Sequence, residues 1–216
     1  MEINRDIYLN RLITRKQNGF IKVITGIRRC GKSYLLNKIF YNYLLSEDVD
    51  KNHIIRFAFD SADDLLLIDE DILDISEQNR KVDPRKFMKY LAGKIVDDEM
   101  YYLLLDEVQL LGNFEAVLNG YMRKDNLDIY VTGSNSKFLS SDILTEFEGR
   151  GDEIHVLPLS FSEFYSVYEG TKEEAFDDFM VYGGLPAIAS MQTDEQKANY
   201  LITQMKNVYI LSLIHI

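Results

Sequence analysis

The stretch FIKVITGIRRCGKS, residues 20–33, decides the fold of this chain. Its opening FIKVIT is rich in β-branched and aromatic side chains, which predicts a strand over 20–25. The following GIRRCGKS fits the spacing G-x-x-x-x-G-K-[ST], and apolar residues then recur at helical intervals over 32–45. A glycine-rich loop between a strand and a helix presents successive backbone N–H groups to an anion. The sequence therefore predicts a phosphate-binding loop over 26–33.

The loop residues have separate expected roles in holding a nucleotide. Lys32 is placed to pair with the β- and γ-phosphates, and Ser33 to bind Mg²⁺ through its hydroxyl. The other expected contacts with the nucleotide come from Gly26, Ile27, Arg28, Arg29, Cys30, Gly31 and Tyr34. Arg28 and Arg29 are equally well explained as solvent-facing side chains or as contacts to a neighbouring subunit. We therefore expect ATP and Mg²⁺ as the bound cofactors.

A second stretch, YYLLLDE over 101–107, reads as a strand that ends in two carboxylates. Its nearly continuous apolar run is typical of a strand buried on both faces. Ligands of parallel sheets bind beside the carboxyl ends of the strands. Asp106 is therefore the candidate Mg²⁺ ligand, directly or through water, and Glu107 is the candidate general base for an attacking water.

The remaining pattern alternates strands with helices, which predicts a parallel sheet with helices on both faces. Further strands are expected at 54–59, 128–132 and 154–157, and helices at 5–16, 84–95 and 114–122. The acidic stretch 61–78 is hard to assign and could form one short amphipathic helix. From Ser160 the pattern is wholly helical, so we expect an α/β domain over 1–158 and a small helical domain over 159–210.

Composition limits the class of protein. The 216 residues are 46% hydrophobic and 27% charged, as in a folded soluble protein, and the formal net charge is −11. An acidic chain is poorly suited to gripping nucleic acid over its whole surface. A single cysteine excludes a disulfide within the chain, and no apolar run approaches the ~20 residues that cross a bilayer. We expect a cytoplasmic protein without membrane contact.

Two alternative nucleotide-binding classes fit less well. A GTPase needs N-K-x-D, whereas the nearest match, 37–40, lacks the aspartate and lies in the expected helix after the loop. A small-molecule kinase usually lacks an acidic pair such as Asp106-Glu107.

The strand at 128–132 ends in GSNS, where Ser134 or Asn135 would lie near the γ-phosphate as a sensor. Both also suit a helix N-cap, and the sequence does not choose between them.

Four segments together resemble a prokaryotic family of AAA-domain, AAA+-like P-loop ATP-binding proteins that carry a C-terminal domain of unknown function. The segments are GIRRCGKSYLL at 26–36, YYLLLDEVQ at 101–109, 131–164 and YGGLP at 182–186. The first two correspond to the Walker A and Walker B motifs. The resemblance implies a five-stranded parallel sheet sandwiched by helices, followed by a helical lid, with ATP bound between them.

The resemblance also implies roles for three residues outside these motifs. Arg150 follows Gly149 as in the family's Gly-Arg motif, and is the candidate arginine finger or sensor, in cis or in trans. A plain surface arginine is the alternative. Gly184 and Pro186 match the Gly-Gly-x-Pro of the lid, where they would approach the nucleotide, or they form an interhelix turn.

Several other acidic and basic residues are expected to have no ligand. The carboxylates Asp60, Asp63, Asp64, Asp69 and Asp71 lack EF-hand spacing and read as a solvated face. The three histidines are scattered and Cys30 is alone, so no zinc set is expected.

The end of the chain is unusual. Residues 211–216, LSLIHI, break the amphipathic pattern before them and read like the translation of a sequencing-library adapter. We therefore expect a non-native tail and a C-terminal region that is missing. Nucleic acid would be a partner only through that region.

The patterns favour an ATPase whose hydrolysis is coupled to movement of the lid and of the missing region. The alternative is a slow-hydrolysing switch or scaffold that recruits a protein or nucleic-acid partner. A homo-oligomer is compatible with either.

Overall fold

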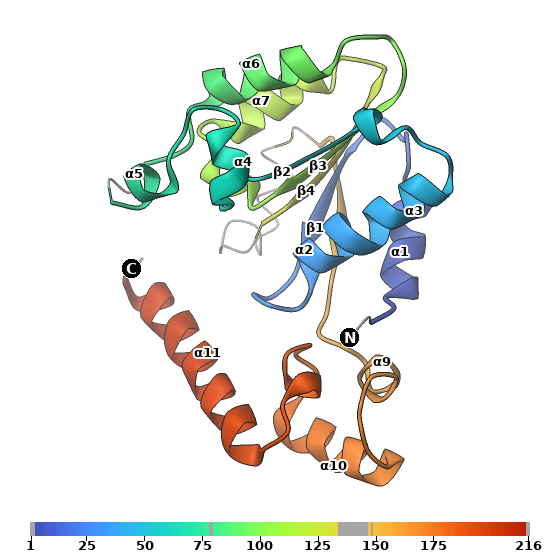
Figure 1. Cartoon of the computed structure of the whole chain (residues 1–216), viewed down its shortest axis with the longest axis vertical. Coiled ribbons are helices and arrows are strands. Elements are labelled where there is room, and N and C mark those ends of the chain that lie inside the picture. Colours follow the sequence, from blue (N-terminus) through green and yellow to red (C-terminus); the bar gives the residue numbers. More distant parts are fainter. Residues whose placement is uncertain (1–2, 78–79, 134–146, 148, 215–216) are drawn as a thin grey trace. The chain divides into compact units, whose positions relative to one another are not determined.

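The structure is a computed structural model that describes residues 3–77, 80–133, 147 and 149–214 (Figure 1). The chain forms two compact units. One is Arg5–Val156, and the other collects the chain from Leu157 onward together with Ile3 and Asn4. The larger unit contains both predicted motifs.

The larger unit is built on a five-stranded sheet in the order β2-β3-β4-β1-β5. Its strands are β1 (Ile21–Thr25), β2 (Ile54–Ala58), β3 (Tyr101–Asp106), β4 (Leu127–Thr132) and β5 (Gly151–His155). Every neighbouring pair is parallel. The carboxyl ends of all five strands therefore lie at one edge of the sheet.

The apolar residues of β3 face both sides of the sheet, as its continuous hydrophobic run predicts. Tyr101, Leu103 and Leu105 of β3 join one core cluster, whereas Tyr102 and Leu104 join the other. All six residues of β3 are buried. Burial on both faces fixes the register, because a shift by one residue would exchange the two cores.

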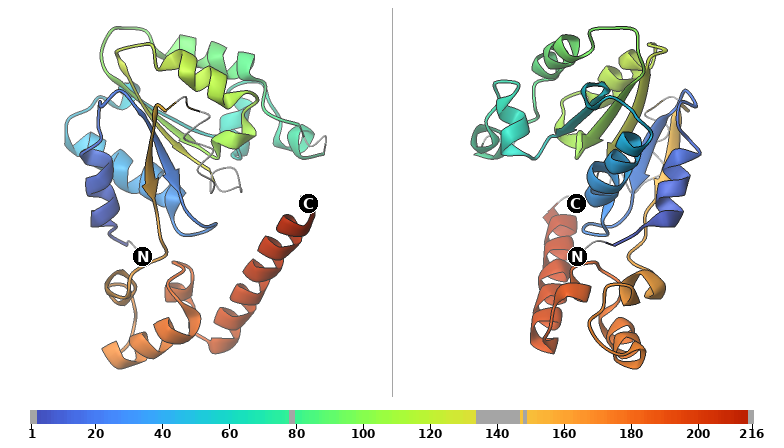
Figure 2. Two further views of the ribbon diagram at one scale, coloured as in Figure 1. Left: turned by 180° about the vertical axis from the view of Figure 1, so that it is seen from behind. Right: turned by 45° about the vertical axis from the view of Figure 1, so that its right-hand side comes forward.

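Helices cover both faces of this sheet (Figures 1 and 2). One face is packed by α1 (Asp6–Ile13) and by a continuous helix made of α2 (Lys32–Tyr34), the π-helical η1 (Leu35–Phe40) and α3 (Tyr41–Ser46). The other is packed by α4 (Ala62–Leu66), α5 (Ile72–Glu77), α6 (Pro84–Lys94) and α7 (Phe114–Tyr121). Two 3₁₀ turns, η2 (Lys51–His53) and η3 (Val108–Leu110), complete this unit.

The five predicted strands and the predicted α/β class are confirmed, with differences at element ends. The last strand begins at Gly151 and ends at His155, earlier than the apolar residues alone indicate. The first helix ends at Ile13 rather than at residue 16. The acidic stretch contains two helices, α4 and α5, instead of one, and Ser61 caps the first by accepting a hydrogen bond from the Asp64 N–H.

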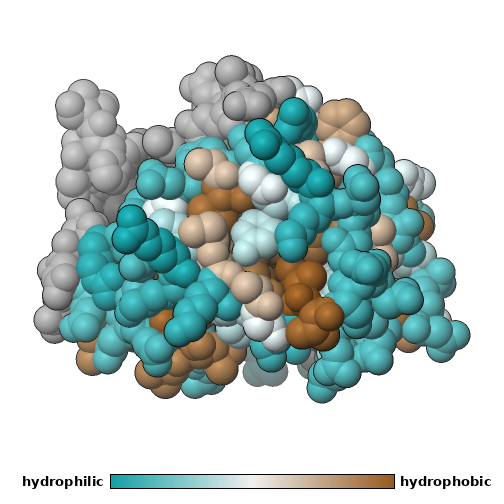
Figure 3. All heavy atoms as spheres, turned by 90° about the horizontal axis from the view of Figure 1, so that it is seen from above, coloured by the Kyte–Doolittle hydropathy of each residue, from teal (hydrophilic) through white to brown (hydrophobic). Residues whose placement is uncertain are grey.

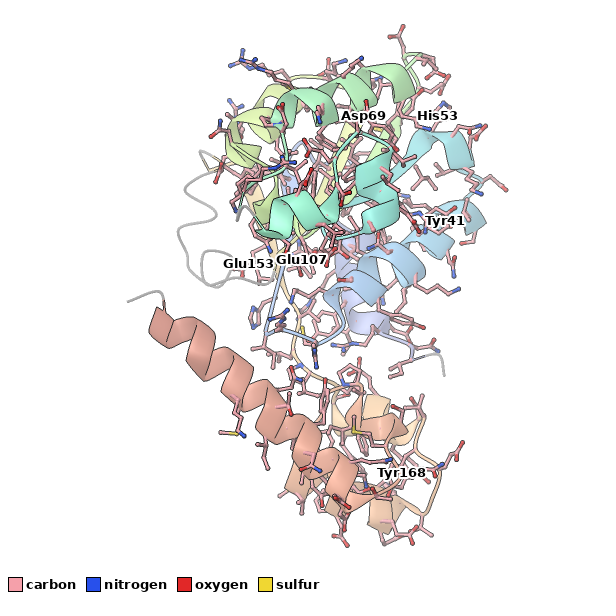
Figure 4. All side chains as sticks on the ribbon, turned by 60° about the vertical axis from the view of Figure 1, so that its left-hand side comes forward. Tyr41, His53, Asp69, Glu107, Glu153 and Tyr168 are labelled. Atoms are coloured by element: carbon pink, nitrogen blue, oxygen red, sulfur yellow. The ribbon has the colours of Figure 1, made fainter. Side chains whose placement is uncertain are left out.

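The smaller unit is helical. It contains α9 (Phe161–Tyr165), α10 (Lys172–Tyr182), the 3₁₀ turn η5 (Ile188–Ser190) and α11 (Asp194–Ile214). Capping boxes begin the first two helices, at Ser160 with Glu163 and at Thr171 with Glu174. Tyr168, labelled in Figure 4, donates a 2.6 Å hydrogen bond to Asp178. The expected tail at 211–216 includes two residues that lie outside the described ranges.

The surface seen in Figure 3 is mostly hydrophilic, with apolar side chains in smaller groups among the polar ones. Single exposed apolar residues are normal on a folded protein. Within the described ranges, no helix combines the length and apolar character that a bilayer-spanning segment needs.

Candidate functional site

The predicted phosphate loop joins the end of β1 to the start of α2. Its backbone enters the left-handed region at three positions, with φ of 139° at Gly26, 66° at Arg29 and 102° at Gly31. Gly26 also lies against the residue that follows β5, since a Cβ there would overlap the carbonyl oxygen of Val156. Glycine at 26 is therefore required both by conformation and by close approach.

Lys32 is buried beneath this loop. Its Nζ donates 3.0 Å hydrogen bonds to the carbonyl oxygens of Gly26 and Ile27. A lysine ammonium has three N–H donors, so these bonds leave one for a ligand held by the loop. The same bonds hold the loop closed over the side chain, and only 4% of Lys32 is exposed.

Asp106 is the centre of the site. Its Oδ1 accepts a 3.0 Å hydrogen bond from the Ser33 hydroxyl and another from Thr132 at the end of β4. Its Oδ2 accepts a 3.0 Å hydrogen bond from the Asn37 amide in η1. Three neighbouring elements thus fix this carboxylate at the end of β3, and charge-assisted bonds of this kind are stronger than neutral ones.

Glu107 leaves the strand with a left-handed backbone, φ 52°, which turns its side chain away from the β3 register. Its N–H donates a 3.2 Å hydrogen bond to the Thr132 hydroxyl. Its carboxylate accepts a hydrogen bond from the side-chain amide of Gln109 in η3. Figure 4 shows Glu107 at the same end of the sheet as Glu153 of β5. Backbone and side chain are therefore both held in place.

Thr25 supports the loop from below. It is fully buried, directly precedes Gly26, and its hydroxyl donates a 2.5 Å hydrogen bond to Glu153. The same oxygen lies 2.9 Å from His155 Nδ1. These contacts tie the carboxyl ends of β1 and β5 together at the point where the loop begins.

Asp60 is exposed, as its expected place on a solvated face requires, and it also lies near the acidic pair. It follows β2, and the preceding Phe59 N–H donates a 3.1 Å hydrogen bond to the Asp106 carbonyl. Loss of hydration, followed by the negative charges of Asp106 and Glu107, raises the pKa of the Asp60 carboxyl above its usual value. Asp60 thus adds negative charge to the site.

Ser33 and Asp106 together suit a magnesium ion. Mg²⁺ prefers oxygen ligands and usually takes only one or two carboxylates besides substrate phosphates and water. Among the described residues no group of three or more His, Cys, Asp and Glu side chains has metal-binding geometry. The donor set therefore fits an ion shared with a bound phosphate rather than a cage of protein ligands.

The structure brings together only part of the predicted site. Gly26, Lys32, Ser33, Asp106 and Glu107 converge at one edge of the sheet, with the other loop residues. Ser134 and Asn135, the two candidate sensors, lie outside the described residues.

Arg150 lies at the other end of the strands. Its carbonyl accepts a 2.9 Å hydrogen bond from the N–H of Ile21, the first residue of β1, whereas the loop follows Thr25. At about 3.3 Å per residue, roughly 13 Å of strand separates the two ends. The structure therefore does not bring Arg150 to the loop of its own chain.

Gly184 and Pro186 lie in the smaller unit. A Cβ at Gly184 would overlap the Leu159 carbonyl oxygen, and the Leu159 N–H donates a 2.7 Å hydrogen bond to the Gly184 carbonyl. Packing within that unit is a sufficient reason for glycine at this position.

Sequence reasoning missed Asn37, Thr132 and Gln109 as members of the site. Asn37 follows Ser33 by four residues, so the two share a helix face. Thr132 ends the strand next to β3, and Gln109 follows Glu107 by two residues. The i,i+4 spacing from Ser33 could have indicated Asn37. The expectation that parallel strands end at one edge of the sheet could have indicated Thr132.

Comparisons with known proteins agree with this geometry. A family model described as "AAA domain" matches residues 18–165. An uncharacterized protein of Haemophilus influenzae is 31% identical over 192 residues, covering 86% of this chain and 44% of the relative. An uncharacterized protein of Methanocaldococcus jannaschii is 29% identical over 223 residues, covering 96% and 44%. The chain thus spans less than half the length of these curated relatives.

Among solved structures, that of C. elegans PCH-2 aligns with a TM-score of 0.53 at 16% identity, covering 76% of this chain and 46% of that one. At this identity the likeness concerns the fold alone. The match over 18–165 spans the loop, the acidic strand and all five strands of the sheet. This chain therefore belongs to the AAA domain family of P-loop NTPases.

Proposed function

We propose that this chain binds ATP with Mg²⁺ at the loop 26–33 and hydrolyses it to ADP and phosphate. The observation that carries the proposal is the hydrogen bond between Ser33 and Asp106. It joins the first helical turn after the loop to the carboxyl end of the acidic strand. The two groups expected to hold Mg²⁺ are therefore already neighbours.

The chain's own residues supply binding and orientation. The backbone N–H groups of the loop would hold the phosphates, and Lys32 would place its remaining N–H on them. Ser33 and Asp106 would hold Mg²⁺, which when bound neutralises charge between the phosphates. Asn37 and Thr132 keep the Asp106 carboxylate in one orientation for that task.

Glu107 would act as the general base. Its carboxylate would take a proton from the water that attacks the γ-phosphorus while the bond to the leaving ADP oxygen breaks. Gln109 would be a positioning residue, because its amide holds the Glu107 carboxylate without itself touching the reacting atoms.

Phosphate release from ATP and Mg²⁺ tests the proposal, with wild type beside Lys32→Ala and Glu107→Gln. We expect Glu107→Gln to lower turnover by about 10²–10⁴-fold while ATP affinity is retained. Lys32→Ala should weaken binding of a fluorescent ATP analogue. Wild-type turnover that does not exceed that of Glu107→Gln, with ATP still bound, would instead support a slow-hydrolysing switch.

We further propose that the helical unit serves as a lid and that Arg150, if it acts on a phosphate, does so from a neighbouring subunit. Its position at the far end of β5 from the loop favours action in trans. A turnover rate per protein molecule that rises with protein concentration, and that falls in Arg150→Ala, would support this. A turnover rate per molecule that is independent of protein concentration, with unchanged activity in Arg150→Ala, would contradict it.

A further inference from the structure

A groove runs along the open edge of the sheet. Its volume is about 750 Å³, and it lies beside β2, the edge strand. Asn37 lines one side, and Tyr90, Gly93 and Lys94 of α6 line the other. In Figure 4, Tyr41 and His53 mark this side of the unit.

The strand beside this groove has backbone groups that point away from the sheet. Successive residues of a parallel strand direct their N–H and C=O groups to opposite sides. The Phe59 N–H donates to the Asp106 carbonyl of β3, so the odd-numbered residues of this segment direct their backbone N–H and C=O groups toward β3. The even-numbered residues Ile54, Arg56 and Ala58 therefore direct their backbone groups to the other side, where the groove lies.

The chain itself already pairs some backbone groups at both ends of this edge. The Ala58 N–H donates a 2.8 Å hydrogen bond to Asp64 Oδ2, and the Ala58 carbonyl accepts a 3.1 Å hydrogen bond from the Ser61 N–H. At the other end, the Ile54 N–H donates to the Lys51 carbonyl. The Ile54 carbonyl and both backbone groups of Arg56 remain directed into the groove. An added strand could pair with these three groups as β3 pairs on the other side of β2.

The groove is basic although the chain has a net charge of −11. Lys51, Arg56 and Lys94 line it, and Asp64 is the one acid among the described lining residues. That acid is already bonded to Ala58. The groove therefore favours a ligand with negative charge.

Two of these cations are held in position by aromatic rings. The Arg56 guanidinium lies 3.9 Å from the centre of the Tyr41 ring and donates a 3.4 Å hydrogen bond to the Asn37 carbonyl. The Lys94 ammonium lies 5.6 Å from the centre of the Tyr90 ring. Cations positioned in this way lose less freedom when they bind a carboxylate.

We propose that this groove binds an extended, acidic peptide segment of a partner protein by β-strand addition. The Ile54 carbonyl and the Arg56 backbone supply the strand pairing, and Lys51, Arg56 and Lys94 contact the acidic side chains. A second copy of this chain is a poor occupant, because pairing two β2 edges would bring Lys51 and Arg56 of both copies together.

Fluorescence anisotropy with the whole chain tests this proposal. The probe is a fluorescein-labelled peptide of alternating glutamate and valine, and the comparison probe alternates lysine and valine. We expect the glutamate peptide alone to bind, with salt-dependent affinity. Methylation of alternate backbone nitrogens on its pairing edge should abolish binding, since strand addition needs those N–H groups.

Arg56→Glu should weaken the glutamate peptide at least about tenfold, as a close ion pair becomes a like-charge contact. Lys89→Glu, on an exposed part of α6 that does not line the groove, is the matched control. Retained binding of a fluorescent ATP analogue shows that each variant is folded. Equal binding of both peptides, binding that survives backbone methylation, or Arg56-dependent binding of an oligothymidylate in place of the peptide would each overturn the proposal.

Discussion

The Ser33 hydroxyl donates a 3.0 Å hydrogen bond to Asp106 Oδ1. This bond links α2, the helix that follows β1 and the phosphate loop, to β3, which lies two positions from β1 in the sheet order. The strand between β1 and β3 is β4, and its Thr132 hydroxyl donates a hydrogen bond to the same carboxylate oxygen. The site is thus assembled where the amino end of a helix meets the carboxyl ends of two parallel strands, which explains why its geometry depends on buried side chains of the sheet.

Thr132→Val tests the contribution of that hydroxyl. The side chain is fully buried, donates to Asp106 and accepts from the Glu107 N–H. Its loss removes the hydrogen bonds to Asp106 and from the part-buried Glu107 N–H, so we expect about 1–3 kcal/mol of destabilisation by urea unfolding and slower ATP turnover. Thr132→Ser keeps the hydroxyl and should recover most of both. Equal losses in the two variants would point to the methyl group instead.

Asn37→Ala tests whether the orientation of Asp106 matters for Mg²⁺. Asn37 donates to Asp106 Oδ2 and is half-buried. Groups that orient a metal ligand typically contribute about 10–100-fold to metal affinity, so the Mg²⁺ concentration for half-maximal turnover should rise about tenfold or more. Asn42→Ala, exposed on the same continuous helix, is the control and should leave the Mg²⁺ dependence unchanged.

The sequence alone predicted the sheet because its signals are local. Alternating buried faces in β3 and the glycine spacing at 26–33 each depend on a few neighbouring residues. Asn37, Thr132 and Asp60 depend instead on which strands lie side by side, and the order β2-β3-β4-β1-β5 does not follow from the chain order. The position of Arg150 could have been predicted, since in a parallel sheet a residue directly before a strand lies at the opposite edge from the loops that follow the strands.

Gly26→Ala should disrupt the loop. Gly26 has φ 139°, and an added Cβ would overlap the Val156 carbonyl oxygen. Because backbone rather than a flexible side chain opposes the new atom, we expect loss of ATP-analogue binding and a lower melting temperature. Gly120→Ala in α7 meets no atom within 4 Å and should be neutral or stabilising by up to about 1 kcal/mol. Unchanged nucleotide binding in Gly26→Ala would show that the loop can move away from β5.

Lys22→Met should be among the most destabilising single changes away from the site. Lys22 is fully buried and forms an ion pair with Asp128, which is 2% exposed. Removing one partner leaves an uncompensated buried charge, which costs about 3–5 kcal/mol. Urea unfolding measures the change, and Lys38→Met on an exposed helix position should stay within about 0.5 kcal/mol. A loss below 1 kcal/mol would mean that Tyr130 and Gln17, which also donate to Asp128, suffice to stabilise it.

Asp60→Asn should stabilise the fold in a pH-dependent way. The pKa of Asp60 is raised in the folded chain by loss of hydration and by Asp106 and Glu107. The folded state therefore holds the proton more tightly, and raising the pH from the ordinary value of 3.8 through the folded value costs stability in the wild type. Asparagine does not titrate and avoids this cost.

Urea unfolding midpoints measured from below pH 3.8 to pH 7 would reveal the difference between Asp60→Asn and wild type. The gain should be absent at the acidic end, grow as Asp60 ionises and stay constant at higher pH. Asp98→Asn, which removes an exposed carboxylate outside this cluster, controls for the change in net charge. A gain of equal size at every pH would assign the effect to hydrogen bonding of the new amide rather than to repulsion within the acidic cluster.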